Sequence, residues 1–403
     1  PPARAAAPAV GDEDHELEAT AQAEALTLQP GATPGTAVEA LRSLQPILTR
    51  EQMEHVIGKA AELKALSPTV TRLMELTGNP RSSLDQVARV VRQDPAVALQ
   101  VLRLANSTVF NRGQPVDSVD RAVMRIGMSH IRQVALTIAV IGRFSGPADR
   151  GQLDILLFWE HAIATGLIAA NLTRRLGGIA VDADAAFTMG LLHDVGRVIL
   201  AEQLGRTYDR VLQTAADLRL PLERVESRML GFNHADVMDK LLHHWSFARQ
   251  LVNPIAWHHL SVPNIRSLTP NEAECVSVLA LANRLAHARL MGSSGNETIY
   301  PIAEFLWSLR LRAQDLPTLQ NSIDIETSDL KVALLRTAPG TVWPSAPNVW
   351  RSRLPRGFCP LFVGADPLGD SMRMALDVLR DPEATTPTHA VAHLEAPRNR
   401  EQV

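Results

Sequence analysis

The chain has 403 residues, of which 46% are hydrophobic and 21% charged; this composition is typical of globular proteins, and the length allows two or three domains. Its net charge of −3 argues against nucleic acid as a partner, and its two cysteines, far apart and in no CxxC pairing, argue against a disulfide framework and favour a cytoplasmic location. No apolar run in the sequence approaches the length that predicts a membrane span.

The two ends of the chain have the composition of flexible segments. Residues 1–45 are rich in Ala, Pro, Gly and acidic residues, and residues 382–403 are similar. Because the sequence begins without Met, we expect it to be part of a longer protein. Between the ends, the patterns predict a main domain over residues 50–262 and a mostly helical extension over residues 263–381.

Capping residues mark the first predicted helices. Ser83 and Gln86 have the spacing of a capping box. Ser67 and Asp94 are each followed by proline, which favours the first turn of a helix. Ser118 precedes a fourth helical pattern, "VDRAVMRIG".

Longer apolar helices follow, and strand-like alternation is scarce, so we predict an all-α, multi-helix bundle. The stretch "AAFTMGLLHDVGRVILAEQLG" is expected to be one helix that ends at Gly205. After Gly292 the pattern weakens and the C-terminal region is poorly defined. There, "IYPIAEFLWSLRL" and "SDLKVALLRTA" predict helices, and "LFVGAD" predicts one short strand for which no partner is evident.

Histidine is concentrated in the middle of the chain, and one histidine stands beside an aspartate inside an apolar run. Buried charges are costly unless they are paired or bound to a metal. The pair His193–Asp194 is therefore either part of a metal site, a hydrogen-bonded pair that joins two helices, or the remnant of a lost active site. The seven histidines of this region are His161, His193, His234, His243, His244, His258 and His259. Of these, His243 and His244 are expected to lie on a partly exposed helix face and to bind nothing.

Several stretches of this region resemble the HDOD domain. The most specific are "DPAVALQVLRLANS" and "IGMSHIRQVAL", and the resemblance continues through "FWEHAIATGLIA", "GLLHDVGRVIL", "HADVMDKLLHHW" and "AWHH". It covers roughly residues 55–262, about half the chain. The resemblance implies an all-α relative of the HD phosphohydrolases that serves as an output or regulatory module in bacterial signalling. Because many such modules have no demonstrated catalysis, it favours a protein that is not an enzyme.

The resemblance also implies a candidate metal site. His161 matches the first histidine of the HD superfamily, and His193 and Asp194 match its paired residues. Asn283 stands where the later Asp is expected, and a neutral amide is a weaker ligand than a carboxylate. We therefore expect partial or absent binding of a divalent metal, with Mn, Fe or Zn as the candidates. Further candidate ligands, which resemble those of two-metal members, are His234, His258 and His259.

Two differences separate this chain from the related HD-GYP phosphodiesterases. No GYP segment follows His258 and His259, and Arg197 replaces the Lys that usually follows the HD pair. Hydrolysis of cyclic-di-GMP by that mechanism is therefore not expected.

Three functions remain open at this point. The first is a signalling module that contacts protein partners. The second is a metal-dependent phosphohydrolase that acts on a nucleotide or phosphoester. The third is a nucleotide-binding sensor that uses the segment from Ser67 to Ser145, which contains ten Arg against five acidic residues. Arg89 and Arg92 lie three residues apart on one predicted helix, and Arg103 is the third candidate binding residue.

Overall fold

The structure is a computed structural model. It describes residues 34–61, 68–128 except 80, 107–109 and 111–112, isolated positions between 130 and 144, residues 151–312 except 246, position 316, and residues 346–392 except 355, 357, 364–370, 383 and 385. Several predictions therefore lie outside the described residues: the extreme ends of both flexible segments, the cap at Ser67, most of "MSHIRQVALTIAVIGRF", and the helix "SDLKVALLRTA".

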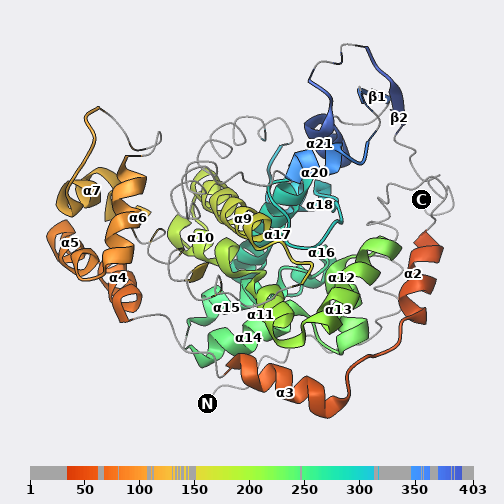
Figure 1. Cartoon of the computed structure of the whole chain (residues 1–403), viewed down its shortest axis with the longest axis horizontal. Coiled ribbons are helices and arrows are strands. Elements are labelled where there is room, and N and C mark those ends of the chain that lie inside the picture. Colours follow the sequence, from red (N-terminus) through yellow and green to blue (C-terminus); the bar gives the residue numbers. More distant parts are fainter. Residues whose placement is uncertain are drawn as a thin grey trace.

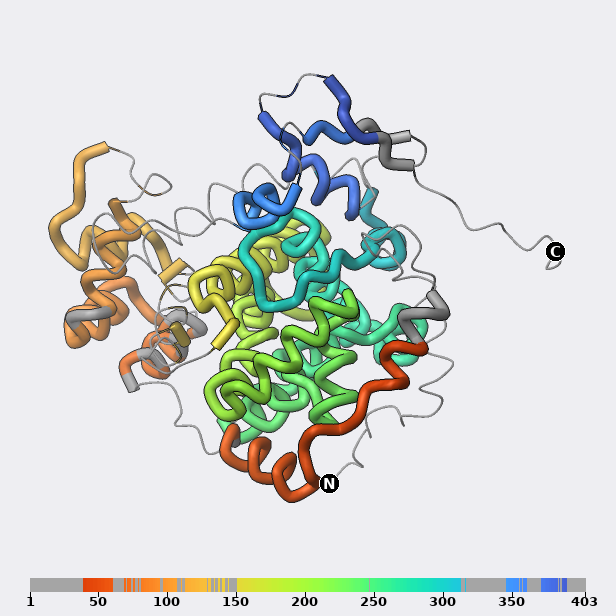
Figure 2. Tube along the Cα trace, turned by 45° about the vertical axis from the view of Figure 1, so that its right-hand side comes forward, coloured from red at the N-terminus to blue at the C-terminus, as the bar shows by residue number. Residues whose placement is uncertain are grey.

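The predicted all-α class is confirmed. The N-terminal helices are α2 (Pro34–Ser43) and α3 (Arg50–Ala61), and a lobe is formed by α4 (Pro68–Gly78), α5 (Leu84–Arg92), α6 (Pro95–Ala105) and α7 (Val119–Ile126). Figure 1 and Figure 2 both place this lobe to one side of the main body. Helix α2 lies within the segment that the composition predicts to be flexible, and it packs on the body, where Arg228 Nη2 donates to Arg42 O over 3.0 Å.

The capping signals at Ser83 and Ser118 in the lobe are confirmed. The Ser83 side chain accepts a hydrogen bond from Gln86 N, while the Gln86 side chain accepts one from Ser83 N, as the capping box requires. Ser118 caps α7 by accepting from Arg121 N. These contacts satisfy backbone donors that a helix N-terminus leaves without partners, so the helices begin where the sequence predicts.

The body is built around helix α9 (Ile155–Leu176), which packs against α10 (Ala183–Leu192) and against α17 (Pro270–Ala288). The expectation that no apolar run has the length of a membrane span is wrong, because α9 is long and apolar enough to span one, with a mean hydropathy of 1.5. However, 78% of that apolar window is buried inside the protein, as in the core helix of a folded domain. The other helices of the body are α11 (Val195–Leu204), α12 (Arg206–Leu218), α13 (Leu222–Leu230), α14 (His234–His244), α15 (Arg249–Trp257), α16 (Val262–Ile265) and α18 (Ala303–Ser308).

A small C-terminal unit, formed by α20, β1, α21 and β2, stands above α17 and α18 in Figure 1. Its elements are α20 (Ala346–Arg351), β1 (Pro360–Val363), α21 (Ser371–Leu379) and β2 (His389–Ala392). The predicted strand exists and has a partner: β1 pairs in parallel with β2, from Pro360 opposite His389 to Val363 opposite Ala392. Strand β2 falls within the segment 382–403 that the composition predicts to be flexible. Cys275 and Cys359 are both free and buried.

Candidate functional site: a buried histidine centre

His193 and Asp194 lie at a junction between two helices, whereas the sequence predicts one continuous helix there. Helix α10 ends at Leu192, His193 is its C-cap residue, and α11 begins at Val195. Asp194 has φ −102° and ψ 0° and makes no side-chain capping bond. The break in the helix therefore leaves its carboxylate available to the protein interior instead of holding it at the helix end.

The Asp194 carboxylate lies at the middle of the cluster. Its Oδ1 is 3.0 Å from His234 Nε2 and 3.7 Å from His258 Nε2. Its Oδ2 is 3.3 Å from His193 Nε2 and 3.8 Å from His161 Nε2. The structure thus brings together all six candidate metal ligands that the sequence predicts. We call the following side chains the histidine centre: His161, His193, Asp194, Arg197, His234, His258 and His259.

Two of these imidazoles are oriented in the same way. His193 Nδ1 lies 2.6 Å from Gly190 O, and His258 Nδ1 lies 2.7 Å from Ile255 O, each three residues earlier in the chain. Because a carbonyl oxygen can only accept, Nδ1 carries the proton in both rings. Each Nε2 therefore has a lone pair, and neither Nε2 makes a hydrogen bond within the described part of the chain. Histidines that bind metals are commonly fixed in this way.

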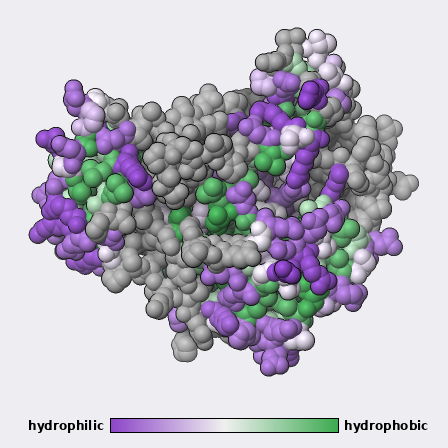
Figure 3. Space-filling model, viewed as in Figure 1, coloured by the Kyte–Doolittle hydropathy of each residue, from purple (hydrophilic) through white to green (hydrophobic). Residues whose placement is uncertain are grey.

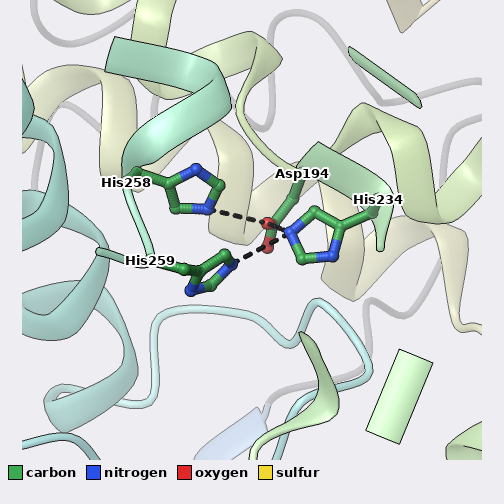
Figure 4. Close-up of side chains that lie close together, drawn as sticks. All are labelled: Asp194, His234, His258 and His259. Atoms are coloured by element: carbon green, nitrogen blue, oxygen red, sulfur yellow. Dashed lines mark hydrogen bonds and ion pairs between the residues drawn. The ribbon is translucent and has the colours of Figure 1, made fainter. Parts of the chain in front are cut away.

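His234 occupies the space between two carboxylates. Its Nδ1 is 2.6 Å from Glu226 Oε2, and its Nε2 faces Asp194. Burial and the nearby Arg197 guanidinium lower the pKa of His234, but the Glu226 carboxylate and the hydrogen bonds to both acids outweigh them and raise it to about 9. Its neighbour His259 lies within 3.0 Å, Nε2 to Nε2 (Figure 4). His259 is the more accessible of the two, with 15% of its side chain exposed.

His161 is paired with the residue that replaces the expected aspartate. Its Nε2 lies 3.0 Å from Asn283 Oδ1, and since the amide oxygen accepts, this Nε2 carries a proton. Burial lowers the pKa of His161 to about 3, and burial also lowers that of His258 to about 4. Both rings are therefore neutral near pH 7.

Arg197 is fully buried and supplies a fixed positive charge to the centre. Its Nη1 lies 2.8 Å from Asp194 Oδ2, and its guanidinium lies within 3.4 Å of the His234 ring. Nη1 also donates to the side chain and the backbone carbonyl of Ser294. Burial alone raises the pKa of the Asp194 carboxyl, but Arg197, followed by His193, lowers it well below the ordinary value. The carboxylate is therefore ionised.

Four completely buried ionised groups in and beside the centre compensate one another. Asp194 and Glu226 are the negative groups, and Arg197 and protonated His234 are the positive groups. All four are completely buried. A buried ionic group without a partner is strongly destabilising, so this balance is what allows the cluster to exist in the core.

The donor atoms can hold a divalent metal once His234 has lost its extra proton and His161 its Nε2 proton, because a ligating nitrogen needs a lone pair. Two sets of candidate ligands share Asp194, one with His234, His258 and His259, and the other with His161 and His193. The lone pair of His193 Nε2 faces a carboxylate oxygen 3.3 Å away, an arrangement that a cation between them would stabilise. The cluster could therefore hold a divalent ion, although Arg197 already places one positive charge on the same oxygen.

Several functional residues of the centre are missing from the sequence prediction. Glu226 and Glu223 lie on α13 beside His234 and His259, at 2.6 Å and 3.7 Å. His287 lies four residues after Asn283 on α17, with its ring centroid 4.5 Å from that of His161 and its Nε2 without a hydrogen bond among the described residues. The spacing of Asn283 and His287 on one helix face is a signal that could have identified His287. No local pattern marks the two glutamates.

The predicted arginine patch lies on the lobe and not at the histidine centre. Arg89, Arg92 and Arg103 are all exposed, on α5 and α6. Arg92 forms an ion pair with Asp120 of α7, and both side chains are about half exposed. Arg89 Nε donates to Asp85 O over 3.4 Å. Among the other histidines, His243 is exposed as expected, although it pairs with Asp239 over 3.2 Å.

Comparison with known proteins identifies the fold around this centre. The HDOD domain family matches residues 63–261. An uncharacterized protein from Treponema pallidum (strain Nichols) is 23% identical over 228 residues, which cover 57% of this chain and 43% of that protein. The chain therefore spans less than half the length of this relative.

Two solved structures have the same fold. An HDOD domain protein of unknown function from Geobacter sulfurreducens has a TM-score of 0.58 at 23% identity and covers 71% of this chain and 98% of its own. A protein from Shewanella amazonensis SB2B, provisionally named a phosphohydrolase, has a TM-score of 0.54 at 24% identity. The match covers 69% of this chain and 97% of that protein. Residues 63–261 therefore form an HDOD domain, and the chain is an HDOD domain protein.

Proposed function

We propose that this HDOD domain protein is a cytoplasmic signalling module that acts through contact with protein partners and without turnover. The observation that carries the proposal is the completely buried pair of Arg197 and Asp194, 2.8 Å apart. A fixed guanidinium on the central carboxylate competes with a metal dication for the same oxygen. In this proposal the centre stabilises the fold, and the outer surface of the domain carries the function.

The lobe supplies a candidate contact surface. Figure 3 shows hydrophilic side chains along the outer edge of the lobe. Arg89 and Arg103 are exposed on α5 and α6 of the lobe. Guanidinium groups bind carboxylates and phosphates through paired hydrogen bonds, so the proposed partner presents an acidic surface.

The test compares charge reversals on the lobe with a change at the centre. Arg89→Glu and Arg103→Glu are combined with Arg92→Gln, because Glu at position 92 would face Asp120 and repel it. The partners captured by in-cell crosslinking should be lost in this variant. They should be retained by His193→Ala in folded protein. If His193→Ala abolishes the signalling response while the lobe variant keeps it, contact through the lobe is the wrong mechanism.

A matched control uses two exposed arginines of another helix. Arg206 and Arg210 lie on α12, four residues apart, and both are exposed. Their reversal to Glu changes the net charge by a similar amount without touching the lobe. The control variant should capture the same partners as the wild type.

A second candidate function is a metal-dependent phosphohydrolase that acts on a nucleotide or phosphoester. The Nε2 atoms of His193 and His258, which face Asp194 and make no hydrogen bond among the described residues, favour it. A divalent metal supplies Lewis-acid activation of water and of a phosphoryl group. The side chains that would hold it are His161, His193, Asp194, His234, His258 and His259.

Elemental analysis separates the two candidates. We expect protein purified without added metal to contain Mn, Fe or Zn at well below one equivalent, because Arg197 and Asn283 both weaken the site. A full equivalent that survives dialysis against a chelator, together with phosphoester hydrolysis that Asp194→Asn abolishes in protein shown to remain folded, would establish the phosphohydrolase instead.

A further inference from the structure

Arg197 is held in place by a segment outside the HDOD domain. We call residues 290–299, which connect α17 to the residues before α18, the strap. Ser294 lies within it and is completely buried. Its Oγ and its carbonyl oxygen both accept hydrogen bonds from Arg197 Nη1, the atom that also faces Asp194. Ser294 therefore helps to decide where the guanidinium lies.

The strap is fitted closely to the helix that carries His161. Ser293 N donates to Leu157 O on α9 over 2.9 Å. Gly292 has φ +72°, and a Cβ at this position would lie 2.3 Å from Leu157 O and 2.4 Å from His161 N. Only glycine can bring the backbone this close, so the strap lies directly against the backbone of α9 next to His161.

The ends of the strap belong to the core of the C-terminal unit. Leu290 and Ile299, at its two ends, pack with Leu376 and Leu379 of α21, and Phe358 lies in the same cluster. An ion pair reinforces this contact, because Arg353 Nη1 lies 3.1 Å from Glu297 on the strap. The strap thus contacts both the C-terminal unit and the histidine centre.

We propose that the C-terminal unit controls metal binding at the histidine centre through the strap. While the strap ends pack against α21, Ser294 keeps the Arg197 guanidinium paired with the Asp194 carboxylate. The guanidinium then neutralises the oxygen that a metal cation would need as a ligand. When the C-terminal unit releases the strap, Arg197 loses its anchor, and the carboxylate becomes available to the cation. This regulation does not depend on the partner contact proposed for the lobe.

The direct test removes the anchor. Zn²⁺ binding to metal-free full-length protein is measured by calorimetry for the wild type and for Ser294→Ala. Hydrogen bonds to charged groups are strong enough that we expect about tenfold tighter binding in the variant. Ser293→Ala is the matched control, because its Oγ contacts Gly295 N and not Arg197, and it should bind like the wild type. Adding His193→Ala to Ser294→Ala should remove the gain, which assigns it to the centre.

The remote test loosens the C-terminal unit. Leu376→Ala opens a cavity beneath the strap ends, and we expect it to tighten Zn²⁺ binding several-fold. Leu73→Ala, in the lobe helix α4, creates a comparable cavity in a buried position away from the strap and should leave binding unchanged. Wild-type affinity in both Ser294→Ala and Leu376→Ala would overturn the proposal, as would equal tightening by Leu73→Ala. Tight binding of one full equivalent of Zn²⁺ by the wild type would also overturn the strap proposal, whatever the crosslinking experiments on the lobe show.

Discussion

At the scale of single residues, Asp194 connects the parts of the histidine centre. Its two oxygens face four imidazoles and one guanidinium, and all of these side chains are buried. Arg197 and the protonated His234 each need a negative partner in the core. The carboxylate is therefore required for stability whether or not the centre binds a metal.

Removal of this charge should strongly destabilise the protein. Asp194→Asn keeps the shape of the side chain but leaves the Arg197 charge without its partner, and breaking a buried ion pair in this way costs about 3–5 kcal/mol. Urea unfolding in the presence of a chelator measures the loss. Asp194→Asn combined with Arg197→Met should recover part of it, because no unpaired guanidinium remains. An unchanged free energy of unfolding in the single variant would contradict a structural role.

The histidines should give the metal-free protein an optimum of stability near pH 6.5. The folded-state pKa values of His161 and His258, about 3 and about 4, lie below the ordinary 6.5, so their contribution is complete above pH 6.5 and is lost as the pH falls. The pKa of His234, about 9, is raised, so its contribution is complete below pH 6.5 and is lost as the pH rises toward 9.

Each of these groups changes the free energy of unfolding by up to about 1.4 kcal/mol per pH unit. Chemical unfolding measured from pH 5 to pH 9 in the presence of a chelator tests this. In His234→Gln, we expect the free energy of unfolding to fall less above pH 6.5 and to keep its wild-type dependence below pH 6.5. Stability that rises steadily across the whole range would contradict the assignment.

At the scale of elements, the approach of α11 to the start of α14 places His234 beside Asp194. Gly196, two residues after Asp194, makes this approach possible, because a Cβ there would lie 2.2 Å from His234 O. Asn233 caps α14 with a capping box to Asp236 and so fixes where the helix begins. The position of His234 thus follows from helix packing and capping together.

Two glycine substitutions should have opposite effects on stability. Gly196→Ala forces α11 and α14 apart. We therefore expect the free energy of unfolding to fall by about 1–3 kcal/mol, the usual cost of adding a methyl group to a well-packed core. Gly58→Ala, at an exposed position in α3 with no atom within 4 Å of the new Cβ, should raise it by about 0.5–1 kcal/mol. Equal effects of the two substitutions, measured by urea unfolding, would show that α11 does not need the close approach.

At the scale of the whole molecule, we expect the fold to be stable without a metal. Arg197 and protonated His234 compensate Asp194 and Glu226 in and beside the histidine centre. Helices α9, α10 and α17 contribute to one hydrophobic core around it. Domains whose metal is structural unfold when the metal is removed. This protein should behave differently.

Chelator treatment should leave the thermal unfolding midpoint of the purified protein unchanged. A metal present at a hundred times its Kd would contribute about 2.7 kcal/mol, which corresponds to a shift of about 3 °C for a chain of this length. Differential scanning calorimetry before and after dialysis against a chelator measures the shift. A drop of that size would mean that a resident metal, and not Arg197, balances the centre.

The sequence by itself determined the class of the fold, the starts of several helices and the members of the candidate metal site. Capping residues such as Ser83 and Ser118 act on backbone groups three residues away, so their effect can be read locally. The resemblance to the HDOD domain identified all six candidate metal ligands, which the structure brings together around Asp194.

Only the tertiary structure decided what surrounds those ligands. The helix break at His193 and Asp194 is invisible to periodicity, because both sides of it are equally apolar. Arg197 meets Ser294 across 97 residues, and β1 meets β2 across nearly 30, so neither pairing has a local signature. The physical reason is that burial, charge balance and strand pairing depend on contacts between residues far apart in the sequence. Local sequence patterns do not record such contacts.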